Sequence, residues 1–169
     1  MGFGKLSLTG RALRYLSARE HSRAELERKL RPYEESSGEL ARVLDALEAK
    51  DFINPARVVE SVINSRSRRM GQARIRQELQ AKGISPELAA PALQALKSTE
   101  YSRALGLWQR RYGGPPADAA SRARQQRFLL GRGFAHDLVH RLLSGRPLEA
   151  DMDVKEDGAD PQGASSGSA

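Results

Sequence analysis

One segment of this chain occurs twice, and its recurrence restricts the fold more than any other feature. Residues 77–93 read QELQAKGISPELAAPAL, and residues 127–143 read RFLLGRGFAHDLVHRLL. In each copy an apolar stripe at helical spacing runs into a cation and a glycine, and a second helical stripe follows. Glycine tolerates the left-handed conformation that ends many helices, so Gly83 and Gly133 are predicted helix stops. A recurring helix–glycine–helix segment is typical of helical repeat proteins.

Start signals for helices also recur along the chain. Two serines precede a glutamate by three residues, as in the capping box, and two polar residues precede a proline at a first helical position. These pairs are Ser22 with Glu25, Ser36 with Glu39, Asn54 with Pro55, and Ser85 with Pro86. No stretch alternates between apolar and polar residues over a strand's length, so the chain is predicted to be all-α. The expected helices are 9–19, 22–31, 37–49, 55–69, 71–82, 86–97, 99–112, 117–131 and 136–144.

These helices divide into three tandem three-helix repeats, at 9–54, 55–98 and 99–144, after a flexible N-terminus at 1–8. A unit of roughly 45 residues buries too little apolar surface to stand alone, so we expect neighbouring units to share a core. Such units stack into an elongated, curved solenoid with a long concave face. Residues 145–169, rich in Gly, Ser, Asp and Pro, are expected to form a disordered acidic tail.

The charge of the chain is divided unevenly along its length. The whole sequence carries a net charge of +7, but six of its acids and only two of its bases lie beyond residue 145. Residues 1–144 hold 26 Lys and Arg against 15 Asp and Glu, a net charge near +11. So basic a body favours DNA or another polyanion as its partner.

Other compartments and partners are disfavoured by what the sequence lacks. There is no cysteine, which excludes disulfides and thiolate zinc sites. No apolar run approaches the roughly 20 residues that span a membrane, and the N-terminus has no signal-peptide core. We therefore expect an intracellular, soluble protein without a membrane partner.

The densest positive charge lies in RSRRMGQARIRQELQAKGIS, residues 66–85, which hold six cations and one acid. Ile75 and Leu79 form one narrow apolar stripe there, and Arg74 and Arg76 fall on its flanks, where their charges remain in water. A guanidinium fork suits the oxygens of a phosphate. The residues predicted to contact the polyanion along the concave face are Arg57, Arg66, Arg68, Arg69, Arg74, Arg76, Lys82, Arg122, Arg124, Arg127 and Arg132.

Three blocks of the sequence resemble the RecX family, regulators of the RecA recombinase. They are ALRYLSAREHSRAELERKL (12–30), DFINPARVVESVINSRSRRMGQARIRQELQAKGI (51–84) and ARQQRFLLGRGFAHDLV (123–139). The resemblance implies three tandem three-helix repeats, a cytoplasmic location, and neither catalysis nor a cofactor. It also implies a monomer that binds the RecA filament on DNA, mainly single-stranded and without sequence specificity. Such a regulator inhibits ATP hydrolysis, filament extension and strand exchange, and so modulates recombination, DNA repair and the SOS response.

The chain departs from the family pattern at a few positions. Val58 and Val62 stand where the family commonly has aromatic residues, which is expected to repack the first interface or to weaken a partner contact. Pro55 replaces a usual acid. Ala135 stands where Ser85 caps the equivalent helix, so the start of that helix should be weaker by about 1 kcal/mol.

Two other functions compete with a filament regulator. The segment RQELQAKGISPELAAPAL, residues 76–93, is compatible with a helix-turn-helix regulator that reads one DNA sequence. His136 and His140 lie one helical turn apart, as in a zinc protease. The acid between them is the short Asp137, and a turn and a low-complexity tail follow where a zinc protease has its third ligand, so neither catalysis nor a metal site is expected.

Some cations and aromatics also have a purely structural interpretation. Trp108 beside arginines is typical of base stacking, but a lone Trp at helical spacing with Leu105 favours the core. The basic run 66–69 is alternatively structural, because cations stabilise a helix C-terminus. Arg103 and Arg141 have no special spacing and are expected to be solvated.

Overall fold

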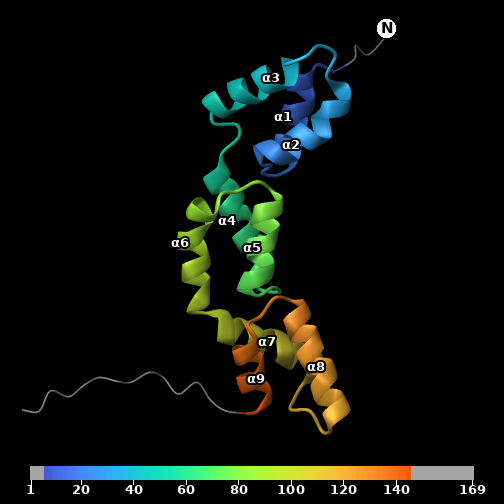
Figure 1. The fold of residues 1–169 in the computed structure, drawn as a ribbon, viewed down its shortest axis with the longest axis vertical. Coiled ribbons are helices and arrows are strands. Elements are labelled where there is room, and N and C mark those ends of the chain that lie inside the picture. Colours follow the sequence, from blue (N-terminus) through green and yellow to red (C-terminus); the bar gives the residue numbers. More distant parts are fainter. Residues whose placement is uncertain (1–5, 146–169) are drawn as a thin grey trace, which may run out of the picture.

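The computed structural model describes residues 6–145, where every regular element is helical, so the all-α prediction is confirmed. The helices are α1 (Leu8–Ala18), α2 (Arg23–Leu30), the 3-10 turn η1 (Arg31–Tyr33), α3 (Glu39–Ala49), α4 (Pro55–Arg66), α5 (Gln72–Ala81), α6 (Pro86–Lys97), α7 (Glu100–Tyr112), α8 (Ala119–Gly131) and α9 (His136–Leu143). Figure 1 shows three groups, α1–α3, α4–α6 and α7–α9, that follow one another along an elongated molecule. Most of the predicted flexible N-terminus and the predicted acidic tail lie outside the described residues.

Capping side chains decide where several helices begin. At α2 the capping box is confirmed: the Ser22 hydroxyl accepts from the Glu25 N–H at 3.2 Å, and the Glu25 carboxylate accepts from the Ser22 N–H at 3.0 Å. Asn54 and Ser85 cap α4 and α6 with their side chains, as predicted. Ala135 forms no side-chain hydrogen bond at the start of α9, which is also as predicted.

Glycines in the left-handed region mark several helix boundaries. Gly83 and Gly133 end α5 and α8 with φ values of +74° and +84°, so both predicted stops are confirmed. The capping box predicted for Ser36 is wrong. Gly38, with φ +78°, directly precedes α3, which makes Glu39 the first residue of the helix and not the third.

The helix α4 is shorter than predicted. It ends at Arg66 and not at Arg69, because the N–H groups of Arg69 and Met70 both turn back to the Arg66 carbonyl, at 2.9 and 3.0 Å. The chain therefore turns between α4 and α5, and the side chains of Arg68 and Arg69 are exposed on this turn.

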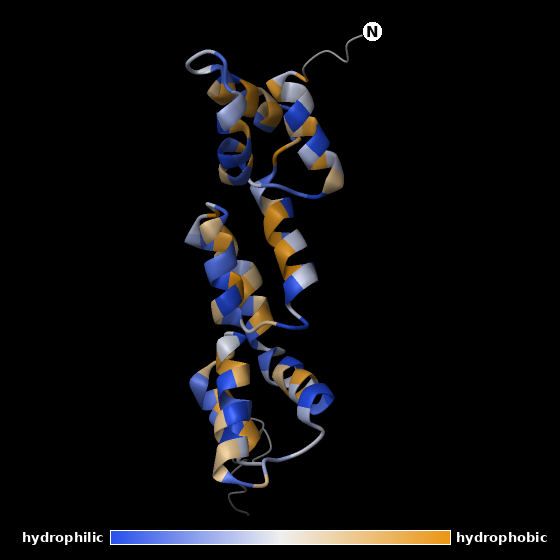
Figure 2. Cartoon of the chain, turned by 90° about the vertical axis from the view of Figure 1, so that its right-hand side faces the viewer, coloured by the Kyte–Doolittle hydropathy of each residue, from blue (hydrophilic) through white to orange (hydrophobic). Residues whose placement is uncertain are grey.

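Each group of three helices has its own hydrophobic core, which overturns the expectation of a core shared between repeats. The buried apolar side chains form three separate clusters, one in each group. The largest fully buried side chains are Leu26, Leu30, Leu44, Val58, Ile75, Leu79, Leu129 and Val139. Figure 2 shows hydrophobic residues on helices of all three groups. The cores are separate because, in every closely packed pair of helices, both helices belong to the same group.

Equivalent apolar positions do not all have equivalent roles. Leu138 is buried, whereas Leu88, which occupies the same position in the other copy of the repeated segment, is 41% exposed. Val58 and Val62 are both buried in the second core. Their small size therefore affects packing within the second group, and not the first interface or a partner contact.

Ion pairs make the junction between the first and second groups. Lys82 Nζ at the end of α5 lies 2.7 Å from Glu25 Oε1 on α2, and Arg57 Nε on α4 lies 3.0 Å from Glu20 Oε1. The Glu25 side chain is almost completely buried and also accepts from Arg19 at 2.9 Å. Burial alone raises the pKa of Glu25, but the hydrogen bonds from Arg19, Lys82 and Ser22 outweigh it and lower that pKa to about 2.

Backbone contacts make the junction between the second and third groups. The Gly71 N–H donates to the Arg132 carbonyl at 2.9 Å, and the Ala73 N–H donates to the Gly133 carbonyl at 3.2 Å. A Cβ atom on Gly71 would lie 2.2 Å from the Gly133 oxygen, so only glycine permits this approach. The start of α5 is thereby held against the end of α8.

Candidate nucleic-acid interface

A hollow of about 500 Å³ lies between the α4–α5 turn and the helix α7, beside the second junction. We call it the arginine hollow, and it is lined by Arg68, Arg69, Ser102, Arg103, Gly106 and Arg110. Four of these six residues are cationic and none is acidic. Guanidinium groups that converge on one open space form a binding site for phosphate or carboxylate oxygens.

Arg103 is the fixed member of the arginine hollow. Its Nη1 donates to the carbonyls of Ser67 and Met70, both at 2.8 Å, and its Nη2 donates to the carbonyl of Leu96 at 3.0 Å. Burial lowers the pKa of Arg103 and the charge of Glu100 partly opposes this, but an arginine remains protonated in proteins. The expectation that Arg103 is solvated is therefore wrong.

Three other arginines of the hollow are free to bind. The side chains of Arg68, Arg69 and Arg110 are exposed, and within residues 6–145 they form no hydrogen bond or ion pair. Gly106 leaves space for the Arg110 side chain, since a Cβ atom at position 106 would lie 3.4 Å from Arg110 Nη1. Like charges gathered without an acid repel one another, so an incoming anion would relieve that repulsion.

Three residues predicted to contact a polyanion have acidic partners in the structure. Arg57 is paired with Glu20 and Asp51, and the hydrogen bond with Asp51 raises the pKa of its guanidinium. Lys82 is paired with the buried Glu25, as described above. Arg66, in the last turn of α4, lies with its Nε 3.0 Å from Glu78 Oε2 on α5. The guanidinium of Arg57 is thus engaged at the first junction and that of Arg66 within the second group.

The other predicted contact residues are spread over two helices outside the arginine hollow. On α5, Arg74 and Arg76 are exposed beside the buried Ile75 and Leu79, as the stripe predicted. On α8 and at its end, Arg124 and Arg127 are exposed, Arg122 donates to the carbonyl of Leu143 at 3.2 Å, and the guanidinium of Arg132 lies over the Phe128 ring. The structure therefore does not bring all eleven predicted residues into one cluster.

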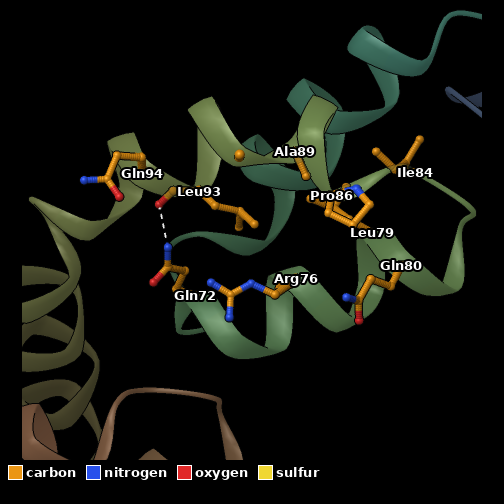
Figure 3. Close-up of a pocket in the computed structure, with 10 residues that line it drawn as sticks. Gln72, Arg76, Leu79, Gln80, Ile84, Pro86, Ala89, Leu93 and Gln94 are labelled. Carbon is orange, nitrogen blue, oxygen red and sulfur yellow. Dashed lines mark hydrogen bonds between the residues drawn. The ribbon is translucent and has the colours of Figure 1, made fainter.

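A second, apolar groove of about 300 Å³ lies between α5 and α6. Figure 3 shows its apolar wall with Leu79, Ile84 and Leu93, and Arg76 beside it. The Gln72 amide donates to the carbonyl of Leu93 at 2.9 Å and ties the two helices together. This groove carries one cation, so it is a weaker site for a polyanion than the arginine hollow.

Trp108 is part of the third core, as favoured above, and base stacking by this residue is excluded. Its side chain is 7% exposed, and its indole N–H donates to Gln125 Oε1 at 2.7 Å. His136 and His140 are exposed on α9. Among residues 6–145 no three His, Cys, Asp or Glu side chains gather as a metal site. In the same part of the chain, no helix is both long and apolar enough to cross a membrane.

Sequence reasoning identified Arg68 and Arg69 but missed two members of the arginine hollow, Arg103 and Arg110. Both lie on α7, in a different group from the α4–α5 turn. A helical wheel of α7 groups them on the face that carries Ser102 and Gly106, since these positions are three and four residues apart. That face of polar and small residues was the sequence signal from which Arg103 and Arg110 could have been predicted as site residues.

Comparison with known families matches all three groups of helices. The first, second and third three-helix domains of RecX match residues 10–47, 56–93 and 98–143. A Leptothrix cholodnii protein named Regulatory protein RecX is 53% identical over 149 residues, covering 88% of this chain and 95% of that relative. A Ralstonia nicotianae protein of the same name is 46% identical over 140 residues, covering 83% and 88%.

A solved structure has the same fold. The crystal structure of RecX from Lactobacillus salivarius matches with a TM-score of 0.66 and 24% identity, over 81% of this chain and 92% of that one. Since all three family domains match in order and the relatives align over most of their length, this chain belongs to the RecX family of regulatory proteins.

Proposed function

We propose that this protein is a negative regulator of the RecA recombinase that binds the RecA–DNA filament and restrains ATP hydrolysis, filament extension and strand exchange. The arginine hollow contacts the phosphates of the DNA in that complex. The observation that supports this proposal is that four arginines and no acid line the arginine hollow. Three of these arginines have no partner among the described residues.

The chemistry of the arginine hollow suits DNA without sequence preference. Arg68, Arg69 and Arg110 present planar forks to solvent, and phosphates accept two hydrogen bonds from one fork. Phosphate contacts position a protein on DNA but do not read its sequence. The elongated shape seen in Figure 1 also lets one protein contact several subunits of a helical filament.

The predicted contact residues differ in whether an acid of the protein already binds them. Arg68, Arg69 and Arg110 bind phosphate around the fixed charge of Arg103. The exposed Arg74, Arg76, Arg124 and Arg127 extend the basic surface on either side of the second junction. Arg57, Arg66 and Lys82 serve mainly to hold helices together, because acids already occupy them.

The first test replaces the three free arginines by alanine: R68A, R69A and R110A in one chain. Each phosphate contact on a single strand contributes about 0.7 to the slope of log affinity against log salt, so the slope should flatten by about 2. The matched control removes three exposed cations from the first group, R14A, R42A and K50A, and should leave the slope close to the wild-type value. An unchanged slope in the R68A/R69A/R110A variant would remove the arginine hollow from the DNA interface.

The second test measures inhibition of RecA itself. Filaments are first assembled on single-stranded DNA with RecA saturating the strand, so that no bare DNA remains for simple competition. The wild-type protein should still slow ATP hydrolysis and stop extension, and the R68A/R69A/R110A variant should not. Absence of inhibition by the wild-type protein on such filaments would refute the proposed function.

A further inference from the structure

The arginine hollow lacks a counter-charge among the residues that the structure describes. Two acids of the neighbouring helices are already engaged: Glu100 is buried and accepts from the Gln72 N–H at 2.8 Å, and Glu78 is paired with Arg66. In water such a cluster binds any carboxylate or phosphate that is held nearby at high local concentration. A source of carboxylates exists within the same chain.

The C-terminal segment has the complementary charge. Residues 146–169 contain six acids, all between residues 149 and 160, and two bases. The acids are Glu149, Asp151, Asp153, Glu156, Asp157 and Asp160. The segment is therefore the most acidic part of a chain whose body carries a net charge near +11.

Gly145, the last described residue before this segment, closely follows α9. Arg122 donates to the carbonyl of Leu143 at 3.2 Å and to the Ser144 hydroxyl at 3.1 Å, which fixes the end of α9, and α9 packs against α7. The 13 residues of α7 span about 20 Å. An extended chain covers about 3.4 Å per residue, so Asp151 reaches about 20 Å from Gly145 and Asp160 about 50 Å. From Asp151 onward the segment is thus long enough to extend over the whole length of α7.

We infer that the acidic segment 149–160 docks on the arginine hollow and competes there with DNA phosphate. This inference rests on the proposed function, because it makes the same arginines the DNA site. Carboxylates form the same forked hydrogen bonds with Arg68, Arg69 and Arg110 that phosphates do. The tethered segment acts at an effective concentration in the millimolar range, so it suppresses weak binding to stray polyanions and yields to the dense phosphates of a filament.

The binding test compares four full-length proteins on fluorescent single-stranded oligothymidine. They are the wild type, a tail-neutral variant (E149Q, D151N, D153N, E156Q, D157N and D160N), the R68A/R69A/R110A variant, and the two combined. Tail neutralisation should tighten DNA binding roughly fivefold with the arginine hollow intact. The same change should have less than about a twofold effect when the three arginines are absent. Equal tightening in both backgrounds would show a general charge effect and would overturn the inference, as would no tightening at all.

A second measurement detects docking without DNA. Because the chain has no cysteine, the single substitution G158C gives a unique site for a nitroxide label. The label should broaden the amide resonances of Ser102 and Gly106, and neutralising the six acids or adding 1 M salt should restore them, since salt screens such contacts. If the amide resonances of Ser102 and Gly106 stay sharp, the tail does not dock on the arginine hollow. If they broaden but R68A/R69A/R110A does not weaken DNA binding, the tail docks on the arginine hollow but the hollow is not the DNA site, so the proposed competition fails. If they stay sharp while that variant weakens DNA binding, the hollow is the DNA site and the tail does not dock there.

Discussion

The substitution G71A tests whether the second junction positions the arginine hollow. The added Cβ would lie 2.2 Å from the Gly133 oxygen and 2.4 Å from the Phe134 nitrogen, whereas real Cβ contacts are essentially never below 3.0 Å. Gly71 itself has an ordinary extended backbone, with φ −77° and ψ 168°, so alanine is not strained there by its own conformation. The clash must therefore push α5 and the end of α8 apart, by about 1 Å.

The magnitude follows from the hydrogen bonds that such a shift breaks. The bonds from the Gly71 and Ala73 N–H groups, at 2.9 and 3.2 Å, each contribute about 1 kcal/mol, so the junction should weaken by about 2 kcal/mol. That free energy corresponds to a factor of roughly 30 in the population of the open junction. Phe134 of the third core borders this junction, but none of the three cores spans it, so the helical content of the protein should not change.

Hydrogen exchange is the direct assay for G71A. The amide of Ala73 should exchange roughly 30-fold faster, and single-stranded DNA should bind more weakly because the turn with Arg68 and Arg69 moves relative to α7. The control is G131A: Gly131 is an exposed helical glycine with nothing within 4 Å of its Cβ position, so alanine there should stabilise α8 by up to about 1 kcal/mol. Wild-type exchange at Ala73 together with wild-type DNA affinity in G71A would refute the role of this junction.

Other perturbations probe the remaining structural features. Glu25 has its pKa lowered from 4.5 to about 2, so its contribution of about 3 kcal/mol is fully present above pH 4.5 and is lost as the pH falls through 2; acid titration of the folded fraction should show this dependence in the wild type and not in E25Q. Replacing Arg103 by Met leaves three carbonyls without their charged donor and should destabilise the fold by about 3 kcal/mol in urea titration, while lysine should restore only part of this. The substitution A135S supplies the missing cap of α9 and should raise stability by about 1 kcal/mol, and no gain in thermal melting would contradict the capping argument. Trp108→Phe removes the bond to the buried Gln125 and should cost about 2 kcal/mol without changing DNA affinity; a large loss of affinity in the folded variant would return Trp108 to the interface.

Sequence alone predicted the helices because their boundaries depend on neighbouring residues. The bonds between Ser22 and Glu25 span three positions, so the pattern of residue types contains them directly. Gly83 and Gly133 were likewise recognisable, since the left-handed conformation is a property of single residues. The Ser36 prediction failed on the same local scale, because Gly38 offered a competing start two residues later.

Only the tertiary structure decided which cations are free. Lys82 pairs with Glu25 across 57 positions, and Arg57 pairs with Glu20 across 37, so no local pattern marks either residue as engaged. Arg103 has no special spacing in the sequence, yet its guanidinium donates hydrogen bonds to carbonyls up to 36 positions away, which hold it in place in the arginine hollow. The separation into three cores is also decided by the tertiary structure, since apolar periodicity shows that a helix face is buried but not which helix covers it. Composition sets the total charge of the chain, and packing then determines which charges face solvent, because an arginine binds whichever acid or carbonyl the fold brings within reach.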